Sequence, residues 1–441
     1  MKPVLIKGGR IIDPDLNTDC LGNLFITGGV ISELTDTDSV TPNGSYEVIN
    51  AEGMIVCPGF VDFHCHLRQP GFEEKETIAS GSRAAAKGGF TTICCMPNTN
   101  PPLDSKETID YVKSIAASEG HIRVLPISCI TRGRKGEELA DMEELAESNV
   151  IAFSDDGDTV MDSDLMRRAM ERSLALGLPI SDHCEDKSIS RGIKTREGAT
   201  AAEENIVGRD ILLAQQTGAH IHIAHISTRG SVELIRRAKE QGINITTEAT
   251  PHHLTLTQDI VPEYGTMAKV NPPLRTQSDV AALIGGLNDG TIDIIATDHA
   301  PHTDKDKQKE FAAAAPGISG FETALASLMG LVHSGQIELK TLIAKLTSEP
   351  AKIISDRFGR LGTIEVGVSA DVTVFDPDLE WTVNTEYFFS KGKNTPLNGK
   401  KLKGKVIATI YNGIIVYRDD SLLVGEVKTG SLRGCAPQKR R

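Results

Sequence analysis

The sequence lacks the features that mark membrane, secreted and nucleic-acid-binding proteins. No apolar run approaches the roughly 20 residues that a membrane-spanning helix needs. The eight cysteines form no CxxC pair, and most lie in apolar stretches, as expected of reduced thiols in a cytosolic protein. The N-terminal segment has no apolar signal-peptide core. A net charge of −13 disfavours binding to nucleic acid or to anionic membranes, so we expect a cytoplasmic protein with a small-molecule ligand.

The composition is that of a globular protein with more than one structural unit. Apolar residues make up 39% and charged residues 24% of the chain, which argues against disorder, and 441 residues exceed the usual size of one domain. The first fifty residues and those after Phe358 alternate short apolar runs with Gly and Asn-Gly turns, which predicts β-strands. We predict one small β-sandwich built from both termini, residues 1–55 plus 358–428, followed by a tail over 429–441.

Between these ends, from about Gly59, short apolar runs alternate with amphipathic or Ala-rich segments. Each run is nearly continuous in apolar residues, as expected of a parallel strand that is buried on both faces. Eight such β-then-α units occur in succession. The count predicts a (β/α)8 TIM-type barrel over residues 56–357.

Side chains that bind metals gather at the predicted strand ends, where barrels of this kind have their active sites. His64 and His66 end the first strand and lie two residues apart, so both point to the same side. Two imidazoles on one short element form half of a zinc site. The ends of the fourth, fifth, sixth and eighth predicted strands add Asp155, Asp156, His183, Glu185, His220, His222, His225, Asp298, His299 and His302. We therefore expect a metal site at this end of the barrel.

Two neighbouring cations need an anionic group between them, and a carboxylate offers two oxygens to share. Asp155 and Asp156 are the carboxylates placed for this role. Strand alternation sends one of them inward and the other outward, and their spacing does not choose between them.

At this point the sequence resembles a known family, the dihydroorotases of the amidohydrolase superfamily, in their bacterial type of roughly 45 kDa. The matching strings in the barrel are FVDFHCHLRQPG, CMPNT, AFSDDG, DHCED, AHIST, EATPHHL, KVNPPLR and TDHAPH. The resemblance extends to GVSADVTVFDPD and NTPLNGKKLKGKVIATIYNG near the C-terminus. One small departure is Gln69, where the family commonly has Glu.

The resemblance implies two zinc ions per subunit. His64 and His66 would bind the first ion, and His183 and His225 the second. The bridging carboxylate would be that of Asp156. Asp298 would be both a metal ligand and the catalytic general acid/base. The residues implied to bind substrate are His66, Arg68, Asn98, Asn271, His302 and the backbone groups of Pro316 and Gly317.

The implied reaction is the reversible cyclisation of N-carbamoyl-L-aspartate to L-dihydroorotate plus water, in de novo synthesis of UMP. A zinc-bound hydroxide would attack the ring carbonyl in the hydrolytic direction, and Asp298 would move the proton. The guanidinium of Arg68, two residues beyond His66, suits a substrate carboxylate. The resemblance also allows a homodimer and an association with aspartate transcarbamoylase, and the sequence decides neither.

Two other functions compete with this interpretation. The first is another cyclic amidase, such as a dihydropyrimidinase or an allantoinase. Many of these relatives bridge their metals with a carboxylated lysine, but no lysine occurs between Val150 and Asp182. The second is a catalytically silent homologue that serves as a structural partner of aspartate transcarbamoylase. Such a protein is expected to lack ligands, whereas every ligand position here is filled.

Several polar residues near the predicted site are expected to have other roles. His220 and His222 are expected to be structural or to support a ligand, and His252 and His253 to give structural support. The side chain of His299 should point in the opposite direction to that of Asp298, because neighbouring residues on a strand alternate. Cys65 should face the barrel wall for the same reason.

Overall fold

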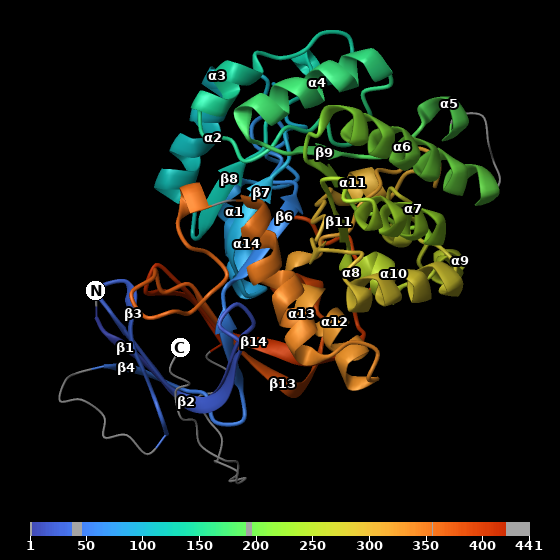
Figure 1. Cartoon of the computed structure of the whole chain (residues 1–441). Helices are drawn as coiled ribbons and strands as arrows, with labels where there is room; N and C mark the ends of the chain where they lie inside the picture. Colours follow the sequence, from blue (N-terminus) through green and yellow to red (C-terminus); the bar gives the residue numbers. More distant parts are fainter. Residues whose placement is uncertain (1, 38–45, 191–195, 355, 420–441) are drawn as a thin grey trace.

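The structure, a computed structural model, describes residues 2–37, 46–190, 196–354 and 356–419 (Figure 1). The tail predicted over 429–441 lies outside the described residues, as do residues 420–428 of the predicted terminal unit.

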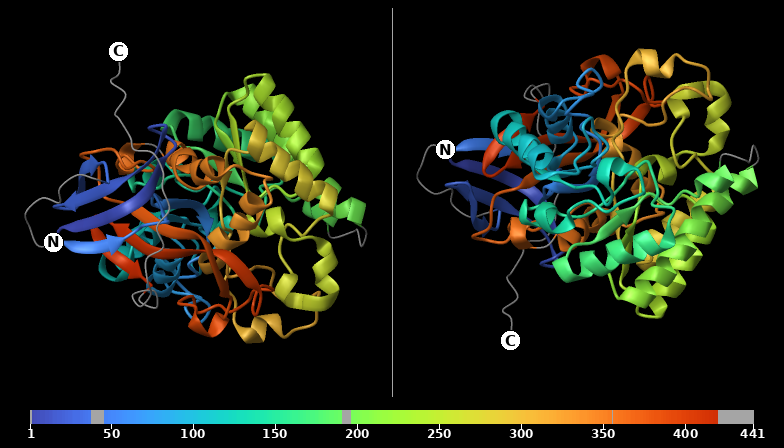
Figure 2. Two further views of the ribbon diagram at one scale, coloured as in Figure 1. Left: turned by 90° about the horizontal axis from the view of Figure 1, so that it is seen from below. Right: turned by 90° about the horizontal axis from the view of Figure 1, so that it is seen from above.

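Strands from both ends of the chain lie in one eight-stranded sheet. Its order is β15-β14-β13-β5-β1-β2-β3, and β4 pairs with β1. The bounds are β1 (Val4–Asp13), β2 (Thr18–Thr27), β3 (Val30–Thr35), β4 (Glu47–Asn50), β5 (Ile55–Pro58), β13 (Val372–Thr382), β14 (Lys401–Tyr411) and β15 (Ile414–Arg418). The two ends meet where β13 runs antiparallel to β5, with Val374 opposite Val56. In Figures 1 and 2 this sheet lies to one side of the helical part of the molecule.

The sheet has a hydrophobic cluster of its own. Ile6 of β1 and Leu24 of β2 contribute to it from the N-terminal strands, and Val374 and Ala408 contribute from the C-terminal strands. The strands from the two ends of the chain therefore pair with each other, and their buried apolar side chains also pack together.

Short parallel strands form the centre of the rest of the chain. One sheet contains β6 (Phe60–Cys65), β7 (Phe90–Cys95) and β8 (Arg123–Pro126), and a second contains β9 (Ile180–Asp182), β10 (Ile221–Ile223), β11 (Ile245–Ala249) and β12 (Ile294–Ile295). Parallel bridges of Phe153 to Ser128 and to Ile180 connect the two sheets, and a parallel bridge between Cys65 and His299 connects their other edges. The strand predicted around Phe153 is reduced to these bridges, because the chain turns at Asp155–Asp158 directly afterwards.

Helices follow these strands and cover them on the outside, as both views in Figure 2 show. The α-helices are α1 (Ile78–Lys87), α2 (Lys106–Glu119), α3 (Met142–Glu147), α4 (Ser163–Leu176), α5 (Lys187–Ser190), α6 (Arg196–Thr217), α7 (Arg229–Glu240), α8 (Pro251–Thr255), α9 (Val261–Tyr264), α10 (Gln277–Asp289), α11 (Asp304–Lys307), α12 (Ala324–His333), α13 (Leu339–Leu346) and α14 (Ser348–Ile354). Short 3-10 turns occur at Arg132–Arg134, Gln258–Ile260, Gly265–Ala268, Phe321–Thr323, Asp356–Phe358 and Thr385–Tyr387. None of the helices in the described part of the chain is long and apolar enough to cross a membrane.

Local sequence signals explain where several helices begin and end. Thr77 caps α1 and Thr276 caps α10, and in each case the backbone N–H of the capping threonine donates in return to the side chain of the third helical residue. Gly177 ends α4 with a φ of 67°, a conformation that glycine adopts without strain. Every residue of β6 and β7 is buried, as predicted for strands covered on both faces. The strand ends are thereby held at fixed positions beneath the site.

Candidate metal and substrate site

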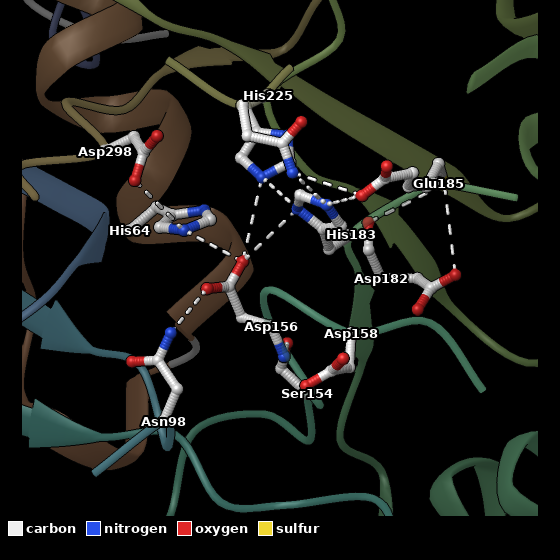
Figure 3. Close-up of polar contacts among 12 residues, drawn as sticks. His64, Asn98, Ser154, Asp156, Asp158, Asp182, His183, Glu185, His225 and Asp298 are labelled. Carbon is white, nitrogen blue, oxygen red and sulfur yellow. Dashed lines mark hydrogen bonds and ion pairs between the residues drawn. The ribbon is translucent and has the colours of Figure 1, made fainter. Parts of the chain in front are cut away.

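Six buried side chains converge beyond the carboxyl ends of the central strands, and Figure 3 labels all of them except His66. They come from β6 and from the segments that follow Phe153, β9, β10 and β12. They are the predicted metal ligands His64, His66, Asp156, His183, His225 and Asp298. The parallel strands therefore bring together residues that are more than two hundred positions apart in the chain.

Asp156 lies at the centre of this group. Its Oδ1 is 3.3 Å from His64 Nε2, 3.7 Å from His225 Nε2 and 3.8 Å from His183 Nδ1. Its Oδ2 is 3.6 Å from His66 Nε2. One carboxylate thus reaches all four histidines, which is the arrangement expected of a bridging ligand.

Asp155 points elsewhere. Its Oδ1 accepts hydrogen bonds from the backbone N–H groups of Ile130 and Thr131 at 2.9 and 3.1 Å, and its Oδ2 accepts one from the Thr131 hydroxyl. Of the two carboxylates that strand alternation left open, only that of Asp156 faces the histidines.

Asp298 lies beside the first pair of histidines. Its Oδ1 is 3.0 Å from His66 Nε2 and 3.7 Å from His64 Nε2. Of the groups of three among the described residues whose ligand atoms lie within 4.8 Å of one another, two belong to this cluster, namely His64, His66 and Asp298, and His64, Asp156 and His225. The two groups share His64.

The donor atoms at this point fit a metal ion. His64 Nε2 and Asp156 Oδ1 are buried, face each other and have no hydrogen-bond partner among the described residues. Burying such groups without partners is costly, and a cation between them would remove that cost. Imidazole nitrogens and carboxylate oxygens are ligands that zinc and similar metals accept.

The electrostatics point in the same direction. Burial lowers the pKa of His64, but the charges of Glu248 and Asp156 outweigh it and raise the pKa well above its ordinary value. Burial raises the pKa of Asp156, but His64 and the other histidines outweigh it and bring the pKa well below its ordinary value. This part of the protein therefore stabilises positive charge, which a metal ion would supply.

Sequence reasoning missed Glu248, which orients the histidines from behind. Its Oε1 is 2.6 Å from His64 Nδ1 and accepts the backbone N–H of His225 at 3.2 Å. Its Oε2 is 3.1 Å from His222 Nε2. A carboxylate that engages Nδ1 leaves Nε2 of His64 as the nitrogen that faces the site. The available signal was an acidic residue inside the apolar strand ITTEA, where a buried carboxylate needs a partner.

Asn98 contacts two of the predicted metal ligands, and Arg68 lies against His302. Asn98 Oδ1 is 2.9 Å from His66 Nδ1, and Asn98 Nδ2 donates to Asp156 Oδ2 at 3.1 Å. Arg68 Nη2 is 3.3 Å from His302 Nε2. Burial lowers the pKa of Arg68 to about 10, against the charges of Asp298 and Asp156, so Arg68 is still cationic at neutral pH. The arrangement places a fixed positive charge next to the predicted metal ligands.

Asn271 lies against the second pair of histidines. Its Nδ2 is 3.2 Å from His183 Nε2 and 3.1 Å from Glu185 Oε2. The carbonyl of Pro316 is 2.9 Å from His302 Nε2, while the N–H of Gly317 donates to the carbonyl of Lys269 at 2.8 Å. The predicted contacts from Pro316 and Gly317 would therefore be made by backbone that is already hydrogen-bonded inside the protein.

Three of these residues have backbone conformations that are uncommon outside glycine. Arg68, His225 and Asp298 have φ angles of 62°, 28° and 44°. Such strain concentrates at functional sites, where the surrounding structure enforces it. The three strained residues follow three of the strands that present the predicted metal ligands.

The other predicted orientations are confirmed for two residues. His299 points away from the site, because its Nδ1 accepts from the backbone N–H of Gly320 at 3.1 Å and its Nε2 is 3.3 Å from Glu76. Cys65 points toward the Cys94 carbonyl at 3.2 Å and not toward the histidines.

Solved structures with similar folds are cyclic amide hydrolases. L-Hydantoinase (dihydropyrimidinase) from Arthrobacter aurescens has a TM-score of 0.86 at 24% identity, with 96% of this chain and 98% of that chain covered. Dihydropyrimidinase from Brevibacillus agri has a TM-score of 0.82 at 22% identity, with 94% and 95% covered. The chain thus has the α/β fold of these enzymes, together with a β-rich part.

Sequence comparison is more specific. Residues 53–231 match the family model described as Dihydro-orotase-like. The dihydroorotase of Caldanaerobacter subterraneus subsp. tengcongensis is 48% identical over 430 residues, which are 94% of this chain and 97% of that protein. The dihydroorotase of Aquifex aeolicus is 48% identical over 431 residues, which are 95% of this chain and 100% of that protein. At this identity over nearly its whole length, the chain belongs to the dihydroorotase family.

Proposed function

We propose that the protein is a zinc-dependent enzyme that interconverts N-carbamoyl-L-aspartate and L-dihydroorotate in pyrimidine biosynthesis. The observation that supports this substrate most directly is the position of Arg68, half-buried next to the buried His302, with the half-buried Asn98 against His66. A partly desolvated guanidinium binds a carboxylate strongly, and dihydroorotate has a carboxylate where hydantoin and dihydrouracil have none.

The six converging side chains are the proposed ligands of two zinc ions. His64 and His66 would bind one ion, and His183 and His225 the other, with Asp156 between them. Asp298 would complete the first group, with which it shares short distances. A bound zinc ion supplies Lewis acidity and makes water a nucleophile near neutral pH.

Asp298 is the proposed proton carrier. Burial raises its pKa, but the hydrogen bond with His66 and the charges of the histidines lower it far below the ordinary value, so the carboxylate is ionised and can accept a proton. In hydrolysis the ring C–N amide bond breaks, the oxygen of water joins the carbonyl carbon, and Asp298 transfers the proton of that water to the ring nitrogen. In the biosynthetic direction the same groups act in reverse.

Arg68, Asn98 and His302 would bind the substrate carboxylate, and Asn271 with the backbone of Pro316 and Gly317 would contact the ring. Burial and the charge of Arg68 lower the pKa of His302 to about 2, so His302 is neutral at physiological pH. A neutral imidazole beside Arg68 leaves the guanidinium as the cation of this subsite.

We also propose the finer organisation of the chain. The central strands would form a closed (β/α)8 barrel over residues 56–357, which the bridges at Phe153 and between Cys65 and His299 support. Residues 1–55 with 358–428 would form a separate β-sandwich, which the pairing of β13 with β5 supports.

The enzyme would be cytoplasmic. A homodimer and an association with aspartate transcarbamoylase are the two assemblies that the family resemblance allows. Light scattering of the purified protein, alone and mixed with aspartate transcarbamoylase, tests both assemblies by mass.

The substrate proposal is tested with purified, metal-analysed protein assayed side by side on dihydroorotate, hydantoin, dihydrouracil and allantoin. We expect turnover of dihydroorotate at a kcat/KM well above that of the three neutral rings. Arg68→Met should raise KM for dihydroorotate by about 10- to 100-fold, because a hydrogen-bonded charge is lost. Turnover of a neutral ring without turnover of dihydroorotate would replace this function with that of another cyclic amidase.

A further inference from the structure

Lys307 is a buried lysine in the segment that connects His302 to Pro316. It ends the short helix α11, and its side chain is among the largest fully buried ones in the described chain. Its Nζ donates to the carbonyl oxygens of Ala315 at 2.9 Å, Gly317 at 3.1 Å and Lys269 at 3.4 Å. An ammonium group has three N–H donors, and each of them has an acceptor here.

These three carbonyls belong to the two backbone segments proposed to contact the substrate ring. Ala315 and Gly317 flank Pro316, and Lys269 lies two residues before Asn271. The N–H of Gly317 also donates to the carbonyl of Lys269 at 2.8 Å. The ammonium therefore lies where the two segments meet and attracts both.

We propose that Lys307 is a positioning residue for the dihydroorotate ring. The ammonium group of Lys307 sets the distance between Asn271 and the Pro316–Gly317 backbone. The inference rests on the proposed function, because those two segments are assigned to substrate there. It differs from a general stabilising role, because the acceptors of Lys307 flank the contact groups themselves.

The side chain of Lys269 binds a different part of the same segment. Lys269 Nζ donates to the carbonyls of Phe311, Ala312 and Ala314, at 2.6, 3.0 and 2.7 Å, and so binds the outer part of the same segment. The two lysines thus hold different parts of the segment, and Lys307 holds the part next to the substrate contacts. Asn394 Nδ2 also donates to the Gly317 carbonyl, at 2.9 Å.

The charges around Lys307 make its role sensitive to pH. Burial and then the charge of Lys269 lower its pKa to about 8, against the opposing charge of Asp306. Asp306 is itself 3.3 Å from Lys75 and 4.0 Å from His302, which burial leaves neutral. Above pH 8 the ammonium loses a proton, one of its three hydrogen bonds and its charge.

The first test compares Lys307→Met with Lys305→Met, an exposed lysine of the same short helix. Steady-state kinetics with dihydroorotate at pH 7 should give a KM about 10-fold higher for K307M, with kcat within about 3-fold of wild type, because binding contacts are displaced and the reacting groups are not. K305M should match wild type in both constants. Thermal unfolding of each variant reports whether it is folded.

The second test measures KM for dihydroorotate as the pH increases from 7 to 9. The KM of the wild-type protein should rise over this range, a result that does not depend on the folding of K307M. Where K307M is folded, it should lack this rise. A K307M variant with the KM of K305M, or a wild-type KM that is constant over this pH range, would overturn the inference while leaving the proposed function intact. A wild-type protein without turnover of dihydroorotate would overturn both.

Discussion

Three of the four histidines in the site, His64, His66 and His183, have one nitrogen that faces the other ligands and one that a neighbour engages. His64 shows this most clearly, since Glu248 occupies its Nδ1 and its Nε2 faces Asp156. Asn98 has the same relation to Nδ1 of His66. Partners behind the ligands therefore decide which nitrogen is available to a metal.

Glu248→Gln tests this control of orientation. One amide oxygen cannot replace two carboxylate oxygens that engage His64 and His222, so we expect metal affinity to fall about 10- to 100-fold. Competition with a chromogenic chelator measures the affinity without any need for turnover. Glu240→Gln, which changes an exposed residue of α7, is the matched control. Equal affinities for the two variants would show that Glu248 does not orient the ligands.

Asp298→Asn tests the proposed proton carrier. The amide has no basic oxygen for the transferred proton, so kcat for dihydroorotate should fall by at least about 10²- to 10⁴-fold. Five other proposed ligands are unchanged, so metal content should be close to that of wild type. Near-normal turnover would contradict the role of Asp298, and a metal-free variant would show that it serves chiefly as a ligand.

Much of the site could be predicted from single residues. The separation of His64 and His66 by two positions predicts that they point the same way, and the structure confirms that their Nε2 atoms approach the same carboxylate. Glu248 could not be found in this way, because its partners are far away in the sequence. The choice of Asp156 over Asp155 depends on the hydrogen bonds of Asp155 to Ile130 and Thr131, which local alternation does not contain.

At the scale of secondary structure, the segments after the strands place the ligands, and some buried contacts tie those segments to the helices. Glu203 of α6 accepts the backbone N–H groups of Ser227 and Thr228, at 2.9 and 3.1 Å, just beyond His225. It also lies 3.2 Å from Arg275. Burial raises the pKa of Glu203, but Arg275 and the hydrogen bonds outweigh it and lower the pKa.

Glu203→Gln should reduce the free energy of unfolding at pH 7 by about 3–5 kcal/mol, because the buried ion pair between Glu203 and Arg275 is broken. A carboxylate whose pKa is lowered by folding stabilises the folded state at pH values above its unfolded pKa of about 4.3. This stabilisation is lost as the pH falls through the lower pKa of the folded state. The difference between wild type and variant should thus be full at pH 7 and shrink below about pH 4. Denaturant titrations at pH 7 and below about pH 4 measure this difference in the free energy of unfolding, with Glu240→Gln as control. A difference that is absent at pH 7 would contradict the account.

A strand or helix can be predicted from the sequence when the residues that encode it lie within the element itself. Buried parallel strands such as β6 and β7 are continuous apolar runs, and capping residues such as Thr77 mark helix starts, so both can be recognised in the sequence. The pairing of β13 with β5 joins residues more than three hundred positions apart, and no periodicity within either segment encodes it. The strand expected at Phe153 is reduced to bridges because the turn that presents Asp156 begins there.

For the whole molecule, the parallel arrangement explains how one site can be built from the entire central part of the chain. Ligands at positions 64, 156, 225 and 298 meet because the carboxyl ends of parallel strands lie at one end of the fold. The same arrangement brings Arg68 and His302, on segments that follow the first and last of these strands, within 3.3 Å of each other. Metal chemistry and carboxylate recognition are thereby adjacent.

The central claim is that activity on dihydroorotate requires metal bound by this cluster. The most direct test is to remove metal from the purified enzyme with a chelator, add zinc back in steps, and record turnover of dihydroorotate against bound zinc. The account predicts no turnover in the metal-free protein and recovery that saturates at two zinc ions per chain, with His64→Ala failing to recover. Full turnover of dihydroorotate by the metal-free protein would contradict it.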